Sequence, residues 1–204
     1  MVMRYLAALW LMLNLFLPAP ALANGKGQWL RKEVTGPAPD FALTDQDGRR
    51  VSLRELHGKV ALLSFIFTHC PTGCPLTTAK LKNIHGTFRE KGLHLVSITI
   101  DPDHDTPEVM KEYARRFSAD LSSWSFLTGT REEIERVQSA YQVAVARKVT
   151  RGLLGEVLAV SLVDHALKIF VIDRSGMKRF EYWGQDFDPH AVTQDLANLL
   201  DERP

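Results

Sequence analysis

The stretch from Val60 to Pro75, VALLSFIFTHCPTGCP, joins an apolar run to a pair of cysteines. Residues Val60 to Phe67 are almost entirely apolar, which is typical of a central strand that is covered on both faces of its sheet. The following residues, Leu76 to Glu90, carry apolar side chains at helical spacing. The pattern therefore predicts a buried strand, a loop that holds Cys70, and a helix with Cys74 at its N-terminus.

The segments around this unit predict further strands and helices. Phe41 to Leu53 contains two alternating runs around the turn signal Asp47-Gly48, which indicates a β-hairpin. Apolar runs predict strands at residues 93–100, 125–128, 167–173 and 178–183. Helical spacing and capping signals predict helices at residues 105–117, 130–141 and 189–200.

This order of elements predicts an α/β fold. A hairpin, alternating strands and helices, a second hairpin and a last helix form a mixed sheet with helices on both faces. Residues 143–163, with Gly152 and Gly155, predict an inserted hairpin or loop before the third core strand. A strand, a cysteine-containing turn and a helix at the start indicate a thioredoxin-like fold.

Length and composition indicate one globular domain with a short appendage. The chain has 204 residues, 45% hydrophobic and 24% charged, with a formal net charge of +1. This composition excludes a disordered or collagen-like chain, and no run of lysines or arginines is long enough to indicate nucleic-acid binding. Residues 24–38 are polar and rich in Gly and Pro and predict a linker, so the domain is predicted at residues 39–204.

Residues 1–23, MVMRYLAALWLMLNLFLPAPALA, have the layout of a signal peptide. Arg4 precedes an apolar run, and Ala21-Leu22-Ala23 supplies a small-x-small cleavage pattern. The alternative is an uncleaved N-terminal anchor, although two prolines interrupt the run before it reaches the length of a membrane span. We therefore expect a periplasmic protein, exported by this segment, with anchoring to the inner membrane as the alternative.

Cys70 and Cys74 are the candidate reactive residues. A disulfide between them closes so small a ring that it stabilises the fold by only about 2 kcal/mol, which disfavours a purely structural role. Pro75 suits the first helical turn and is expected to keep Cys74 out of helical conformation. At a helix N-terminus, unpaired N–H groups and the helix dipole are expected to lower the pKa of the Cys74 thiol.

Two kinds of chemistry are open to this pair. Thiol–disulfide exchange usually uses two intervening residues and a cis-proline, whereas here three residues intervene and no proline lies between Pro107 and Pro189. Where that proline is expected, the sequence has Val163-Asp164-His165-Ala166. A histidine with two thiolates favours a copper site. Soft sulfur ligands favour Cu(I) most of all, with Cu(II) as the alternative.

Four segments together resemble the Sco/SenC family of copper chaperones. They are FTHCPTGCP (67–75), ITIDPDHDTPEVMKEYARRF (98–117), LTGTREEIERV (127–137) and VDHALKIFVID (163–173). The resemblance covers about residues 37–200 and implies that Cys70, Cys74 and His165 bind copper. One departure is Ala166, because the family usually has threonine or serine after the Asp-His pair, and this affects the surroundings of His165 rather than a ligand.

The resemblance also implies a function. The family helps to assemble the binuclear copper site of cytochrome c oxidase, so the expected acceptor is the oxidase subunit that holds this site, and another copper chaperone is the expected donor, both near the membrane. The resemblance therefore implies a carrier of copper rather than an enzyme. The alternatives are a thiol–disulfide oxidoreductase, in which Cys70 and Cys74 form the catalytic redox pair and reduce the acceptor's cysteines, or a redox or copper sensor.

Other polar residues are weaker candidates for a role at the copper site. His69 adjoins Cys70 and is expected to tune its thiol or to serve as a ligand, and Asp164 is expected to orient the imidazole of His165. Asp101 and Asp105 are expected to cap and position a helix, with a role near the site as the alternative. The remaining histidines have no ligand spacing and are expected at the surface or half-buried: His57, His85, His94, His104 and His190.

Overall fold

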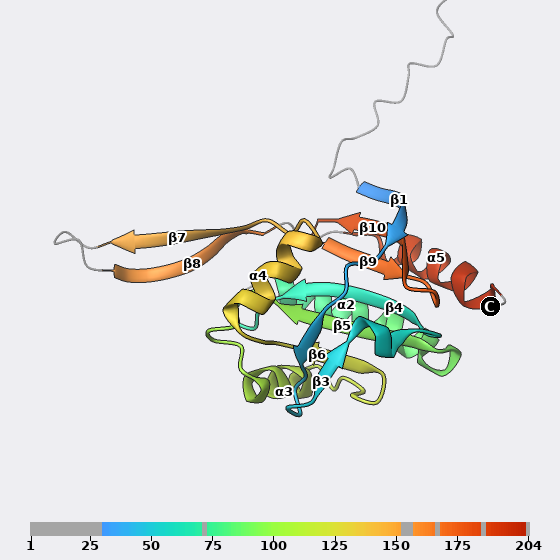
Figure 1. The fold of residues 1–204 in the computed structure, drawn as a ribbon, viewed down its shortest axis with the longest axis horizontal. Helices are drawn as coiled ribbons and strands as arrows, with labels where there is room; N and C mark the ends of the chain where they lie inside the picture. The colour runs from blue at the N-terminus through green and yellow to red at the C-terminus, as the bar shows by residue number, and fades with distance from the viewer. Residues whose placement is uncertain (1–29, 71–72, 152–156, 166–167, 185–186, 203–204) are drawn as a thin grey trace, which may run out of the picture.

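The computed structural model describes residues 30–70, 73–151, 157–165, 168–184 and 187–202, with the backbone alone for residue 30 and residues 146–165. The described residues form a six-stranded mixed sheet in the order β1-β10-β9-β4-β5-β6 (Figure 1). Its strands are β1 (Leu30–Pro37), β4 (Val60–Ile66), β5 (Leu93–Thr99), β6 (Trp124–Leu127), β9 (Lys168–Ile172) and β10 (Met177–Trp183).

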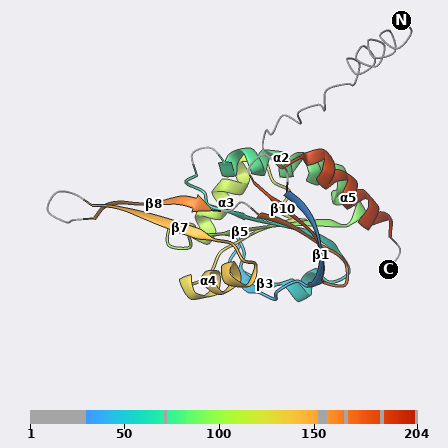
Figure 2. The same ribbon diagram turned by 90° about the horizontal axis from the view of Figure 1, so that it is seen from above.

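Helices cover both faces of this sheet, as the sequence predicts. They are α2 (Gly73–Phe88), α3 (Pro107–Arg116), α4 (Arg131–Ala140) and α5 (Pro189–Asp201). Figure 2 shows α2 and α5 on one face, and α4 with the small hairpin β2 (Ala42–Thr44) and β3 (Arg50–Ser52) on the other. The predicted thioredoxin-like α/β class is confirmed.

The central strands are apolar because both their faces are covered. Every residue of β4 and of β5 is buried. The two strands pair in parallel from Val60 opposite Leu93 to Ile66 opposite Thr99, while β9 pairs with β4 in the antiparallel direction. The carboxyl ends of β4 and β5 and the start of β9 therefore lie at one edge of the sheet.

Local capping signals identified the starts of α3 and α4. Thr130 and Glu133 form the predicted capping box of α4, in which each side chain accepts a backbone N–H of the other residue. Thr106 caps α3 by accepting the N–H of Val109, and Pro107 occupies the first turn.

The predicted linker is wrong for residues 30–37, which form the edge strand β1. This strand pairs with β10 from Leu30 opposite Trp183 onward. The Arg31 guanidinium also binds both carboxylate oxygens of Asp195 in α5, at 2.6 and 2.8 Å. Pairing with distant partners thus overrides the polar, Gly- and Pro-containing composition that indicated a linker. The predicted signal peptide at residues 1–23 and the rest of the linker lie outside the described residues.

The predicted inserted hairpin is present as β7 (Val145–Arg151) and β8 (Val157–His165), an antiparallel pair that forms a sheet of its own. Both views show this hairpin projecting from the body of the domain (Figures 1 and 2). Gly152 and Gly155 fall outside the described residues. None of the helices within the described ranges is both long and apolar enough to cross a membrane.

Two histidines expected at the surface or half-buried are instead buried in the core. His85 and His94 are each less than a tenth exposed, and their Nε2 atoms contact Ser123 and Ser125 at 2.9 and 3.0 Å. Burial, together with the nearby charges of Lys59 and His85, lowers the pKa of His94 to about 4.

We predict that His94 makes the fold sensitive to acid. Between pH 6.5 and 4 the unfolded chain binds a proton at His94 that the folded chain does not bind. The free energy of unfolding therefore decreases by about 3 kcal/mol as the pH is lowered from 6.5 to 4. Urea unfolding at a series of pH values should show a smaller decline for His94→Gln. The exposed His190→Gln serves as control, and equal declines in all three proteins would contradict the assignment.

Candidate metal centre

The two cysteines lie together at the carboxyl end of β4. Cys70 is in the loop after the strand, and Cys74 is the second residue of α2. Both are free thiols, Cys70 is 7% exposed and Cys74 is completely buried. Open α/β sheets place their functional sites at this edge.

The helix begins earlier than the sequence predicts. It starts at Gly73 rather than near Leu76, so Cys74 has helical conformation despite the proline that follows it. Pro75 is tolerated at the third helical position because the first-turn N–H groups have no partner within the helix. The expectation that Pro75 keeps Cys74 non-helical is wrong.

The helix N-terminus acts on the other cysteine. The backbone N–H of Cys74 donates to Cys70 Sγ at 3.3 Å. Burial raises the pKa of the Cys74 thiol far above its ordinary value, and the Cys70 sulfur raises it further, while a hydrogen bond with the Phe67 backbone opposes the change. The predicted lowering of the Cys74 pKa is therefore wrong, because desolvation dominates the environment of this thiol.

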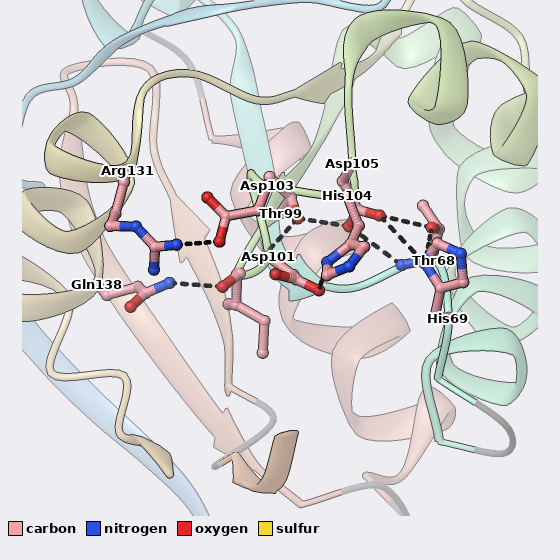
Figure 3. A network of polar contacts seen from close by, with 10 residues as sticks. Thr68, His69, Thr99, Asp101, Asp103, His104, Asp105, Arg131 and Gln138 are labelled. Atoms are coloured by element: carbon pink, nitrogen blue, oxygen red, sulfur yellow. Dashed lines mark hydrogen bonds and ion pairs between the residues drawn. The ribbon is translucent and has the colours of Figure 1, made fainter. Parts of the chain in front are cut away.

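Asp105 joins the cysteine loop to the neighbouring loop. Its carboxylate is completely buried and accepts the Thr68 N–H at 3.1 Å, the Thr68 hydroxyl at 2.5 Å and the Thr99 hydroxyl at 2.6 Å (Figure 3). Burial raises the pKa of this carboxyl group, although the hydrogen bonds oppose the shift. Asp105 thus has the predicted positioning role, but it holds the cysteine loop, and Thr106 caps the helix.

Asp101 and the exposed histidines form the outer part of this network. His69 Nδ1 contacts the Thr68 hydroxyl at 3.2 Å and lies 3.9 Å from Asp105 Oδ1. His104 Nδ1 lies 2.9 Å from Asp101 Oδ2. Figure 3 shows both rings beside the buried carboxylate. His57 and His190, away from this network, are exposed as predicted.

Thr68 and Thr99 are the site residues that sequence reasoning missed. Each hydroxyl donates to Asp105, and Thr99 also accepts the N–H of Asp101 at 2.9 Å. The only signal in the sequence is their position at or just after the end of a buried strand, where side chains meet at the sheet edge.

His165 is the last residue of β8, and its backbone pairs with that of Val145. Since Lys168 starts β9, and Ile169 pairs with Ser64 of β4, the chain enters the sheet at the edge where Cys70 lies. The side chains of His165 and Asp164, and all of Ala166, lie outside the described residues. Among the side chains that are described, no three His, Cys, Asp or Glu residues form a metal-binding group.

This arrangement defines a thioredoxin-like domain with a buried dithiol at the carboxyl end of its central strand. The SCO1/SenC family profile matches residues 31–201. The SCO1 protein homolog of Bacillus subtilis is 32% identical over 167 residues, which are 80% of this chain and 82% of that protein. The chain belongs to the SCO1/SenC family.

Solved structures of this family have the same fold. Arabidopsis thaliana ScoI with copper bound has a TM-score of 0.67 and 27% identity, over 81% of this chain and 98% of the other. BsSco, described as a member of the Sco family of cytochrome c oxidase assembly proteins with a disulfide switch, has a TM-score of 0.67 and 25% identity, over 86% of this chain and 100% of the other.

We predict that Asp105→Ala destabilises the domain by about 2–4 kcal/mol, because it removes the acceptor of the buried Thr99 hydroxyl and of the half-buried Thr68 N–H and hydroxyl. Asp105→Asn keeps one acceptor oxygen, so its free energy of unfolding should decrease by less. Urea unfolding of the reduced protein measures both effects. A loss below about 1 kcal/mol for the alanine variant would show that the carboxylate does not hold the two loops together.

We also predict unequal reactivity of the two thiols. Cys74 is inaccessible and its raised pKa keeps it protonated at neutral pH, so iodoacetamide should modify Cys70 first. Peptide mass spectrometry of the reduced protein, quenched at successive times, gives the two rates. Faster modification of Cys74 would contradict its assignment as the buried, neutral thiol.

Proposed function

We propose that this protein is a periplasmic copper chaperone that carries copper on Cys70, Cys74 and His165 and delivers it to the binuclear copper site of cytochrome c oxidase. The observation that carries the proposal is the pair of free, buried thiols at the carboxyl end of β4, in a chain of the SCO1/SenC family. Copper is the cargo in this proposal, and no substrate is converted.

The donor set suits Cu(I). Two sulfur atoms provide the soft ligands that select this ion, and the imidazole of His165 adds a nitrogen ligand. The sheet topology supports the third ligand, because the chain passes from His165 into β9 at the edge where Cys70 and Cys74 lie. Structures of relatives with copper bound, from Arabidopsis thaliana, Bradyrhizobium japonicum and yeast, support the choice of metal.

Transfer then follows from ligand exchange. Three protein ligands leave an open position on the ion, and an acceptor cysteine can enter there before a ligand of the chaperone leaves. Leu76, two residues after Cys74, is 51% exposed and offers an apolar contact beside the site to such an acceptor. The family description of BsSco as a cytochrome c oxidase assembly protein supports the oxidase subunit with the copper site as acceptor.

A second candidate is thiol–disulfide exchange, in which the Cys70–Cys74 pair reduces the cysteines of the acceptor. The two free thiols, linked by the contact of the Cys74 N–H with Cys70 Sγ, and the disulfide switch described for BsSco support it. Copper and a disulfide use the same sulfur atoms, so the two activities exclude each other at any one moment. His165 separates them, because only copper binding requires an imidazole.

We predict that the reduced chain binds one Cu(I), and that Cys70→Ala and Cys74→Ala abolish this binding. His165→Ala should weaken it by more than about tenfold, which is 1.4 kcal/mol, while the dithiol still forms a disulfide. Titration against a Cu(I) chelator of known affinity measures binding, and thiol counting before and after oxidation measures the disulfide.

The exposed His190→Ala is the matched control and should bind like the unaltered chain. Unchanged affinity in His165→Ala would remove the imidazole from the ligand set. Absence of Cu(I) binding by the unaltered chain, together with rapid exchange with thiols, would favour the oxidoreductase.

A further inference from the structure

Two exposed histidines lie side by side at the rim of the dithiol site. His69 belongs to the loop between β4 and α2, and His104 to the loop between β5 and α3. Their ring centroids are 5.7 Å apart, with the planes inclined at 67°. The side chains are 66% and 64% exposed. The fold thus brings two imidazoles together from positions 35 residues apart in the chain. Their spacing in the sequence does not indicate a metal site.

The hydrogen bonds fix the proton of the His69 ring. The Thr68 hydroxyl has one hydrogen, and it donates that hydrogen to Asp105 Oδ1. Thr68 Oγ1 must therefore accept its other hydrogen bond, which comes from His69 Nδ1. A neutral ring with its proton on Nδ1 has a lone pair on Nε2. By fixing the direction of the Thr68 hydroxyl, the buried carboxylate therefore leaves His69 Nε2 free to bind a metal ion.

The same logic applies to His104. Its Nδ1 lies 2.9 Å from Asp101 Oδ2, and a carboxylate oxygen accepts the Nδ1 proton. Within the described part of the chain, no hydrogen bond reaches Nε2 of either ring. A histidine whose Nδ1–H is held by a carboxylate or another fixed acceptor is the usual form of a metal-binding histidine in proteins.

We propose that Nε2 of His69 and Nε2 of His104 together bind a divalent transition-metal ion, Cu(II) most tightly, at a site separate from the dithiol. Imidazole nitrogens lie about 2.0–2.1 Å from such an ion, which puts the centres of two rings on one ion roughly 4.5–6.4 Å apart, depending on the angle at the ion. The observed separation of 5.7 Å falls in that range. Imidazole suits Cu(II), Ni(II) and Zn(II), and Cu(II) binds tightest of the three. Water completes the coordination of an ion at such an exposed site.

The charges around the two rings favour a cation. Asp101 and Asp105 lie behind the rings. The neighbouring arginines are already paired: Arg131 with Asp103, and Arg116 with Glu112. A hollow of about 330 Å³ runs from His69 along α3 and is also lined by Glu108, whose pKa is lowered by hydrogen bonds with its own backbone and with Thr106.

The test removes the proposed Cu(I) ligands first, so that failure of the Cu(II) site and failure of the proposed chaperone function can be distinguished. In a full-length chain carrying Cys70→Ser, Cys74→Ser and His165→Ala, Cu(II) is titrated and followed by electron paramagnetic resonance. Nitrogen hyperfine structure from two imidazoles is expected. His104→Ala or His69→Ala in this background should lower the affinity at least tenfold and remove the two-nitrogen signal, because one imidazole alone does not chelate.

Two further variants separate this site from adventitious binding. Asp101→Ala leaves both ligands in place but removes the acceptor of the His104 proton, and it should weaken Cu(II) binding by about tenfold. His190→Ala removes an exposed histidine elsewhere and should leave binding unchanged. Equal Cu(II) affinity and equal spectra in the background chain, His69→Ala and His104→Ala would overturn the proposal. Circular dichroism of each variant excludes loss of the fold as the cause.

Discussion

The carboxylate of Asp105 is the contact on which the site depends. Parallel pairing of β4 and β5 brings the loops after both strands to one edge of the sheet, but pairing alone does not fix how these loops lie. Asp105 fixes them by accepting three hydrogen bonds, two from Thr68 and one from Thr99. These three donors offset the energetic cost of burying the carboxylate, so the loss of any one of them weakens the connection between the two loops.

Burial of the dithiol has a consequence for its chemistry. A completely buried thiol such as Cys74 resists ionisation, because a lone thiolate in an apolar surrounding lacks solvation. A cation that binds both sulfur atoms supplies the missing charge compensation, so in the proposed function metal uptake and proton release occur together. The same environment makes the metal-free pair a poor nucleophile at Cys74, which leaves attack to Cys70, whose sulfur receives the N–H at the start of α2.

Local signals predicted most of the fold, and long-range contacts account for the differences. The unbroken apolar run of β4 and the capping box of Thr130 and Glu133 depend on neighbours in sequence, so they could be recognised there. The edge strand β1 depends on Arg31 reaching Asp195, 164 residues away, and no local pattern reports such a partner. The same reason applies to the buried ion pair of Lys168 and Glu181, in which Lys168 Nζ lies 2.8 Å from Glu181 Oε1. At the site, the cysteines can be recognised in the sequence by their residue type and spacing. The roles of Thr68 and Thr99, and the proximity of His69 to His104, can be recognised only in the structure, where the two loops lie side by side.

The two parts of the proposed copper site are held by different constraints. Cys70 and Cys74 lie between β4 and α2, and the Asp105 contacts tie their loop to the sheet. The backbone of His165, in contrast, pairs with β7, in a hairpin that forms a sheet separate from the main one. Val143 and Val145 anchor the base of that hairpin through contacts with the core. In the proposed site the two sulfur atoms and the imidazole would therefore be held by different sheets, so a substitution in the hairpin is expected to affect the imidazole more than the dithiol.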